Sequence, residues 1–240
     1  MQEITDQEIL DLEKMFSQMI GLKIDWLSIP NKALSGFEPS QIAVIINTLL
    51  DGILPQIELL ATDPENLEKL THIGLSKAPG ELGEREGYPD YVHISGKRVE
   101  LKGLFVDNAE LKLKRPPTRR EPSARLKENI TMQKIDGKND VLLIAAIQLK
   151  DDGVRCYPFI IDIAVFSMIE CIRARDKRLI NGGGKWFGDL PKVISVTGRQ
   201  KIKEGIELTD QDYEMDTNFG KLKRIPYPPL QTFLAKYRTL

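Results

Sequence analysis

The sequence predicts an α/β or α+β fold, in which helices flank a mixed β-sheet. Apolar residues recur every three to four positions over residues 3–20 and 39–60, as in helices that cover a core. Short apolar and β-branched runs follow between residues 91 and 163, as in a meander of strands. We expect a helical region at residues 1–75 to pack on a core at residues 76–240. The 240 residues, 41% of them hydrophobic, suit a single compact domain.

Three helices are expected in the first third of the chain. The helix at residues 3–20 has the capping-box pair Thr5 and Glu8 at its start. The helix at residues 39–60 begins at a Pro-Ser pair, and a proline at position 55 kinks or ends it. A short third helix at residues 64–71 has an aspartate cap followed by proline.

The rest of the chain reads as strands followed by a helix. Glycines and prolines at residues 76–89 mark a loop, and a strand, a turn and a strand follow it. The expected strands are 91–94, 98–102, 109–114, the buried central strand 141–148, 155–163 and 192–196. A helix is expected from about residue 164 to residue 180, where a glycine run stops it, and a short helix ends the chain.

Charge is divided unevenly along the chain. Residues 1–90 hold 6 Lys and Arg against 16 Asp and Glu, whereas residues 91–240 hold 28 against 19. A basic second half can bind a polyanion, although a solvated surface has the same composition.

The composition also excludes several kinds of site. Two cysteines make no disulfide framework, and two histidines make a zinc site or histidine-based catalysis improbable. With no run of 18 apolar residues and no signal peptide, we expect a cytoplasmic protein that does not use a membrane.

One segment combines acids and a base at a spacing that suits catalysis. A three-residue turn at residues 95–97 would place Asp90 opposite Lys102 and Val92 opposite Glu100. Side chains two apart on a strand share a face, so Asp90, Glu100 and Lys102 would project together. A two-residue turn would instead put Asp90 on the face of Leu101. Two converging carboxylates need a cation, and oxygen ligands favour Mg²⁺. Lys102 would then stabilise developing negative charge or orient the attacking water.

The residues Pro89-Asp90 and Glu100-Leu101-Lys102 resemble the motif of the PD-(D/E)XK nucleases, and the helical front with its strand meander resembles a type II restriction endonuclease of that superfamily. The resemblance implies that Asp90 and Glu100 bind the metal, with Leu101 in the same metal site, and that Lys102 helps to activate water. Members often add a glutamate from a preceding helix. Glu58 is our candidate, and Glu84 and Glu86 are alternatives. Mg²⁺ is the expected cofactor, Mn²⁺ is expected to substitute for it, and Ca²⁺ is expected to support binding without cleavage.

Basic residues close to this motif are expected to contact DNA. Prolines hold the segment 111–128 extended, so its cations can follow phosphates or reach guanine edges in the major groove. A glycine-rich stretch at residues 180–186 and the segment 197–201 are further candidates, each as readily explained as a loop or cap. The predicted contacts are Lys112, Lys114, Arg115, Arg119, Arg120, Ser123, Arg125, Lys127, Asn181, Lys185, Arg199 and Lys201.

The resemblance implies a site-specific endonuclease that hydrolyses double-stranded DNA and leaves 5′-phosphate ends. Such an enzyme is expected to act as a homodimer on two-fold DNA, with a DNA methyltransferase as its genetic rather than physical partner. Two alternatives stay open at this point: a repair or recombination nuclease with little base specificity, and a DNA-binding protein without catalytic activity.

Overall fold

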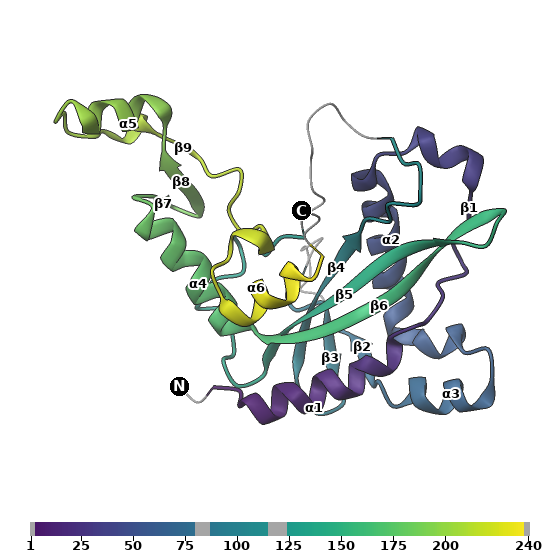
Figure 1. Ribbon diagram of the computed structural model, residues 1–240. Helices are drawn as coiled ribbons and strands as arrows, with labels where there is room; N and C mark the ends of the chain where they lie inside the picture. Colours follow the sequence, from purple (N-terminus) through teal and green to yellow (C-terminus); the bar gives the residue numbers. More distant parts are fainter. Residues whose placement is uncertain (1–2, 80–86, 115–123, 238–240) are drawn as a thin grey trace. The chain divides into compact units, whose positions relative to one another are not determined.

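The computed structural model describes residues 3–79, 87–114 and 124–237 (Figure 1). The chain divides into two compact units, each built from two segments. Unit 1 comprises Met1–Ala124 and Asp136–Ser167, and unit 2 comprises Arg125–Ile135 and Met168–Leu240. The N-terminal helices and the large sheet belong to the same unit.

The core of unit 1 is a mixed sheet, as the sequence predicted, and it has six strands. Its order is β1-β6-β5-β4-β3-β2, with β4 and β5 parallel and the other neighbours antiparallel. β5 contains a continuous buried apolar run, which suits a strand covered on both faces, whereas burial alternates along the first half of β6. The strands are β1 (Ile29–Pro30), β2 (Leu75–Lys77), β3 (Tyr91–His93), β4 (Arg98–Val106), β5 (Asp140–Asp151) and β6 (Arg155–Ser167).

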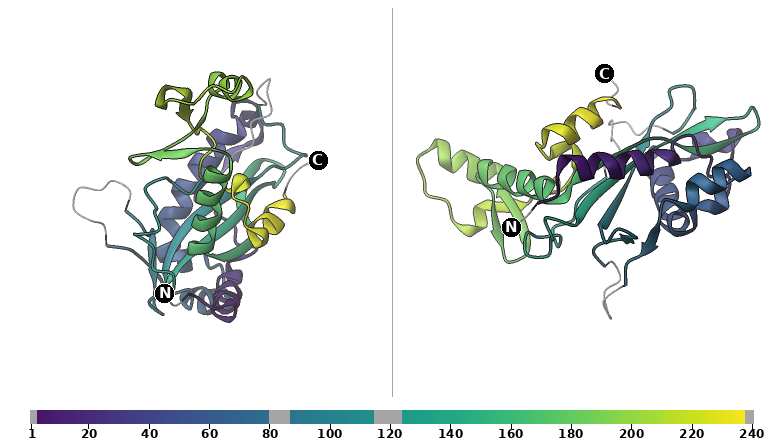
Figure 2. Two further views of the ribbon diagram at one scale, coloured as in Figure 1. Left: turned by 90° about the vertical axis from the view of Figure 1, so that its left-hand side faces the viewer. Right: turned by 90° about the horizontal axis from the view of Figure 1, so that it is seen from below.

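Helices cover this sheet within unit 1, and all three predicted helices are present. They are α1 (Asp6–Phe16) with its 3-10 extension η1 (Ser17–Met19), α2 (Pro39–Ile53) with η3 (Leu54–Leu60), and α3 (Pro64–Thr71); a short η2 (Asn31–Gly36) precedes α2. The predicted capping box forms at Thr5 and Glu8, and the chain kinks at Gln56, next to the proline that the sequence marked. α1 runs alongside β6, and the Glu13 carboxylate accepts a 3.0 Å hydrogen bond from the Val165 N–H (Figure 2).

α2 packs on β4 at a point that requires glycine. A Cβ atom at Gly103 would lie 1.7 Å from Oδ1 of Asn47 on α2. The group that approaches this glycine is therefore a helix side chain of the same unit.

The stretch Pro39–Leu60 is also the one described helical segment that is long and apolar enough to cross a membrane, with a mean hydropathy of 1.5. The expectation from the sequence was that no segment could span a membrane. Ile42, Ile46, Leu50 and Ile57 of the same stretch are buried in the core cluster of unit 1, as is usual for a helix that covers a sheet.

Unit 2 contains α4 (Met168–Asn181), a three-stranded sheet and several short helices. The sheet order is β7-β8-β9, all antiparallel. Its elements are β7 (Lys185–Phe187), β8 (Leu190–Ile194), α5 (Val196–Lys203), η4 (Asp210–Asp212), β9 (Tyr213–Met215), η5 (Leu222–Arg224) and α6 (Pro228–Ala235). Arg175 of α4 is buried and donates to the carbonyl oxygens of Lys127 at 2.6 Å and Ile130 at 2.8 Å, which ties the first segment of the unit to the second.

Three expectations about the elements were wrong. Residues 164–167 continue β6 instead of starting the helix, because they pair with residues 141–144 of β5. Residues 109–114 form turns instead of a strand, with the Asn108 carbonyl accepting from the Leu111 N–H at 3.1 Å. The segment 196–203 is helical and not a loop, since the Ser195 hydroxyl caps it by accepting from the Gly198 N–H.

Candidate active site

The hairpin β3–β4 presents the three motif residues on one face of the sheet. Tyr91 pairs with Val99, so the same register places Asp90 opposite Glu100. The sequence predicted Lys102 at that position. The turn does have three residues, but it spans residues 94–96, with Gly96 at φ +81° and the His93 N–H donating to the Lys97 carbonyl at 2.8 Å. This moves the register by two residues, which preserves the face on which each side chain lies.

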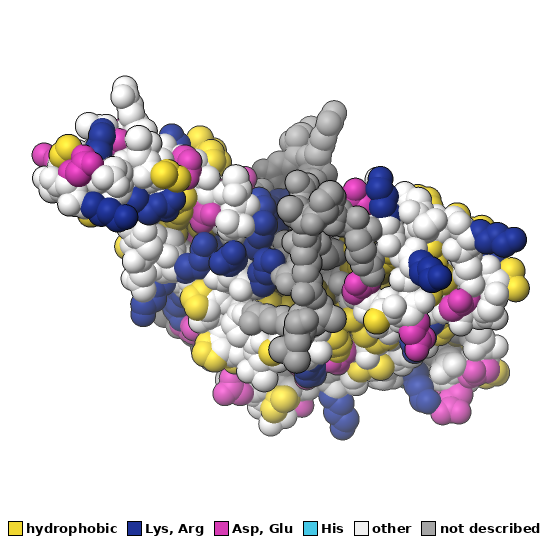
Figure 3. Space-filling view, turned by 45° about the horizontal axis from the view of Figure 1, so that its top comes forward, with side chains coloured by type: hydrophobic (Ala, Val, Ile, Leu, Met, Phe, Trp, Pro, Cys, Tyr) yellow, Lys and Arg dark blue, Asp and Glu magenta, His cyan; other side chains and the backbone are white. Residues whose placement is uncertain are grey.

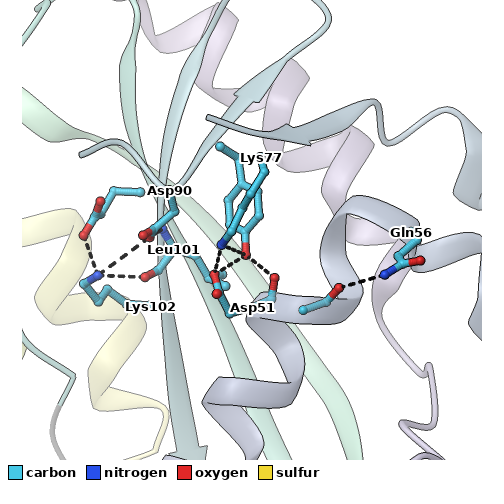
Figure 4. A network of polar contacts seen from close by, with 9 residues as sticks. Asp51, Gln56, Lys77, Asp90, Leu101 and Lys102 are labelled. Carbon is cyan, nitrogen blue, oxygen red and sulfur yellow. Dashed lines mark hydrogen bonds and ion pairs between the residues drawn. The ribbon is translucent and has the colours of Figure 1, made fainter. Parts of the chain in front are cut away.

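Asp90 directly precedes β3 and is held there by hydrogen bonds from backbone N–H groups. Its carbonyl accepts from the Ala78 N–H at 3.1 Å, and its Oδ2 accepts from the Leu101 N–H at 2.7 Å. Burial raises the pKa of Asp90 above its ordinary value, although the charge of Lys102 and the bond from Leu101 act against that rise. The loop thus fixes one carboxylate against the backbone of β4 (Figure 4).

Glu100 is buried within β4, with its side chain 6% exposed. Its Oε1 lies 2.5 Å from the Lys102 ammonium, while Oε2 is buried without a hydrogen-bond partner. Burial raises the pKa of Glu100 to about 7; Lys102 opposes this rise and the charge of Asp90 reinforces it. A buried, unpartnered carboxylate oxygen is costly, and a cation is the partner that would compensate it.

The ammonium of Lys102 lies among the oxygens of this site. Its Nζ is 2.5 Å from Oε1 of Glu100, 2.9 Å from the Leu101 carbonyl oxygen and 3.9 Å from Oδ2 of Asp90. Two carboxylates and a backbone carbonyl are the oxygen ligands that Mg²⁺ accepts, usually together with water. Within residues 3–79, 87–114 and 124–237, no group of three or more His, Cys, Asp or Glu side chains gathers as a metal site. The donor set therefore fits a metal that retains several waters and does not fit an all-protein cage.

A third acid reaches this neighbourhood from α2. Asp51 accepts from the Lys77 ammonium at 2.5 Å and from the Tyr91 hydroxyl at 2.5 Å, and its charge acts on Asp90 (Figure 4). Burial tends to raise the pKa of Asp51, but the hydrogen bonds from Lys77 and Tyr91 outweigh it, so the pKa is lowered. Asp51 therefore stays an anion near the motif.

The acid predicted from this helical segment was Glu58. Glu58 is half-buried in η3, beyond the kink at Gln56, whereas Asp51 precedes the kink and acts on Asp90. Glu84 and Glu86, the alternatives, lie outside the described residues. No local sequence pattern distinguishes Asp51, because its partners come from strands 26 and 40 residues away.

A buried network lies beside Glu100 at the start of β4 and β5. The Tyr88 hydroxyl donates to Oδ2 of Asp140 at 2.5 Å, and Oδ1 of Asp140 lies 3.0 Å from Nε of Arg98. Asp140 is fully buried, which raises its pKa despite these partners, and its charge contributes to the raised pKa of Glu100. Tyr88 precedes Asp90 by two residues, so this bond also anchors the loop that carries Asp90.

The predicted DNA contacts are dispersed over both units. In unit 1, Lys112 and Lys114 are exposed, while Arg115, Arg119, Arg120 and Ser123 lie outside the described residues. In unit 2, Arg125, Asn181 and Arg199 are exposed, with Arg199 on α5 rather than in a loop. Lys185 forms an ion pair with Asp210 at 2.9 Å, and Lys201 forms one with Asp212 at 2.7 Å. The Lys127 carbonyl accepts a hydrogen bond from Arg175.

Comparison of the chain with models of known protein families, with curated proteins and with solved structures finds no match.

Proposed function

We propose that the chain is a Mg²⁺-dependent endonuclease that cuts double-stranded DNA at specific sites, as a type II restriction enzyme does. One observation carries the proposal. A lysine ammonium lies among a buried glutamate, a backbone carbonyl and an aspartate, all on β4 and the loop before β3. Metal-assisted hydrolysis of a phosphodiester needs these groups together: oxygens for the cation and a nearby positive charge that is not a metal ligand.

In this proposal Asp90, Glu100 and the Leu101 carbonyl hold Mg²⁺. Bound Mg²⁺ would supply polarisation of the phosphoryl oxygen and a coordinated water of lowered pKa. The ammonium of Lys102, which lies beside the same oxygens, would stabilise negative charge on the phosphoryl oxygens or orient the attacking water. Asp51 adds negative charge near this ammonium.

The atoms balance for hydrolysis that leaves 5′-phosphate ends. The water oxygen forms a new bond to phosphorus and loses a proton to solvent. The bond between phosphorus and the 3′ oxygen breaks, and that oxygen leaves as a hydroxyl after taking up a proton. The phosphate stays on the 5′ end of the downstream strand.

Further parts of the proposal follow from this activity. One active site per strand matches duplex DNA with a homodimer, and Mn²⁺ would replace Mg²⁺ at the same oxygens. A nuclease of this class would act in the cytoplasm and without a membrane. Its cognate methyltransferase would be a genetic partner.

Cleavage of an end-labelled duplex by the purified chain tests the proposal. Asp90→Asn, Glu100→Gln and Lys102→Met are each expected to reduce cleavage by about 10²–10³-fold or more. Glu110→Gln changes an exposed glutamate of unit 1 and serves as the matched control. Cleavage by any of the three variants at the rate of the control would contradict the assignment. Cleavage without sequence preference would indicate a repair nuclease, and binding without cleavage a non-catalytic protein.

A further inference from the structure

The two units carry opposite net charge. Unit 2 contains 17 Lys and Arg against 10 Asp and Glu, whereas unit 1 contains 17 against 25. Five bases and no acid follow Asp216 in the sequence. Figure 3 shows Lys and Arg side chains gathered on the part of the surface that unit 2 forms. The excess positive charge is therefore a property of unit 2 and not of the predicted loop alone.

Four of these cations come together from two separate segments of unit 2. Arg125 and Lys221 face each other in an antiparallel bridge, and Lys223 and Arg224 follow in η5. The Arg125 guanidinium donates to the Thr217 carbonyl at 2.9 Å, and the Lys221 ammonium donates to Oδ1 of Asn218 at 2.9 Å. Neutral oxygens orient the first two cations without neutralising them.

The join between these segments is specific. The Leu126 N–H donates to the Gly220 carbonyl at 2.8 Å. Gly220 has φ +71°, and a Cβ at this position would lie 1.8 Å from the Leu126 carbonyl oxygen. Only glycine permits this approach, so the backbone itself sets Arg125 beside Lys221.

Assembling like charges in this way costs free energy in the free protein. Burial lowers the pKa of Lys221, and the charges of Arg125, Lys223 and Arg224 lower it further. The nearest acid that acts on Lys221 is Asp216, which already pairs with Arg178 at 3.2 Å. A surface of this kind is stabilised when a polyanion approaches it.

We propose that Arg125, Lys221, Lys223 and Arg224 form a phosphate-binding surface for the backbone of duplex DNA. The proposal rests on the nuclease function and deepens it, since it gives unit 2 the task of holding the duplex. Four contacts of this kind would contribute about −3.6 to the slope of log affinity against log salt, because each contributes about −0.9. Such contacts position the duplex and do not read its sequence.

The surface continues along the chain into a groove of about 690 Å³, lined by α4 and by the residues after η5. Arg173, Lys177 and Arg178 of α4 line it, together with Pro226 and Tyr227. Pro226 is two residues beyond Arg224.

The double variant Lys221→Gln/Arg224→Gln tests this surface. Its matched control is Lys32→Gln/Lys203→Gln, which removes the same charge from exposed positions of unit 1 and unit 2. Both are made in a Glu100→Gln background and titrated with a random-sequence duplex, without metal, between about 50 and 200 mM salt. The cluster variant is expected to lower the slope by about 1.8. Over this fourfold range of salt, wild type should then weaken about twelvefold more than the cluster variant. A slope equal to that of the control would overturn the proposal.

Gly220→Ala provides a second variant, which keeps all four charges but separates Arg125 from Lys221. The salt slope of this variant is expected to fall by about 0.9, which is the contribution of one phosphate contact. Its α-helical circular dichroism should stay unchanged. A slope equal to that of wild type would contradict the cluster geometry. Stronger binding of single-stranded RNA than of duplex DNA would contradict the choice of ligand. Mg²⁺-dependent cleavage is measured separately. If the wild-type chain cuts no duplex, the proposed nuclease function is contradicted. If the cluster variant still loses affinity for DNA, the phosphate-binding surface is supported independently of cleavage.

Discussion

Replacing Glu100 with glutamine should change how the stability of the folded chain depends on pH. Glu100 has a pKa of about 7 in the folded chain, against 4.5 for an ordinary glutamate. A raised folded-state pKa means that the folded chain binds the proton more tightly than the unfolded chain. Its stabilising contribution is complete below pH 4.5 and is lost as the pH rises through about 7. At about 1.4 kcal/mol per tenfold change, the ionised carboxylate lowers the free energy of unfolding by about 3 kcal/mol above pH 7.

Urea unfolding in the presence of a chelator measures this effect. The ion pair between Glu100 and Lys102 also depends on pH, because only the ionised carboxylate forms it, but the folded-state pKa of Glu100 already includes its effect. The difference in unfolding free energy between Glu100→Gln and wild type should therefore shift in favour of the variant by about 2–3 kcal/mol from pH 5 to pH 8. Glu110→Gln should show no such shift. A difference that stays constant within about 0.5 kcal/mol would show that Glu100 is not held in a site that disfavours its charge.

Three further predictions concern the metal and the packing of the site. Mg²⁺ binding should displace a proton from Glu100, so titration calorimetry should show affinity falling about tenfold per pH unit below about pH 7; a flat profile would exclude Glu100 as a ligand. The Lys102→Met variant should bind Mg²⁺ but not cleave DNA. With the wild-type chain, Ca²⁺ should support duplex binding without cleavage, because calcium accepts a looser oxygen geometry. Rapid cutting in Ca²⁺ alone would contradict this. Gly103→Ala should destabilise unit 1 by about 1–3 kcal/mol, because the added Cβ clashes with Asn47. Adding Asn47→Ala to the same chain should recover most of that stability. A double variant as unstable as Gly103→Ala alone would show that the clash is not with Asn47.

The face shared by Asp90, Glu100 and Lys102 could be predicted because it depends only on the period of two along a strand. The exact pairing could not, since the turn begins one residue earlier than expected at residues 94–96. The even change in register preserved the face and moved only the partner of Asp90.

The missed groups are those whose partners are distant in sequence. Asp51 is one acid in an apolar helix, and only folding brings Lys77 and Tyr91 to it. Asp140 directly precedes the predicted buried strand 141–148, and its pairing with Tyr88 depends on the parallel alignment of β4 and β5. The segment 196–203 has few apolar residues, so its helix follows from the Ser195 cap and not from periodicity.

The cluster of cations around Lys221 could not be predicted from the sequence for the same reason. The basic second half was evident in the composition, and Arg125 was a predicted DNA contact. Its neighbours Lys221 and Arg224 are about a hundred residues away along the chain, and the antiparallel bridge that joins them has no local signature.

Digestion of one sequenced plasmid tests the central claim most directly. The purified chain and its Glu100→Gln variant are incubated with the plasmid and Mg²⁺, and the ends of the products are mapped. The nuclease assignment predicts discrete fragments from the wild-type chain, with 5′-phosphates that ligate without prior phosphorylation, and intact plasmid with the variant. An uncut plasmid with the wild-type chain, or the same fragments with both proteins, would contradict the assignment of Asp90, Glu100 and Lys102 as a catalytic site.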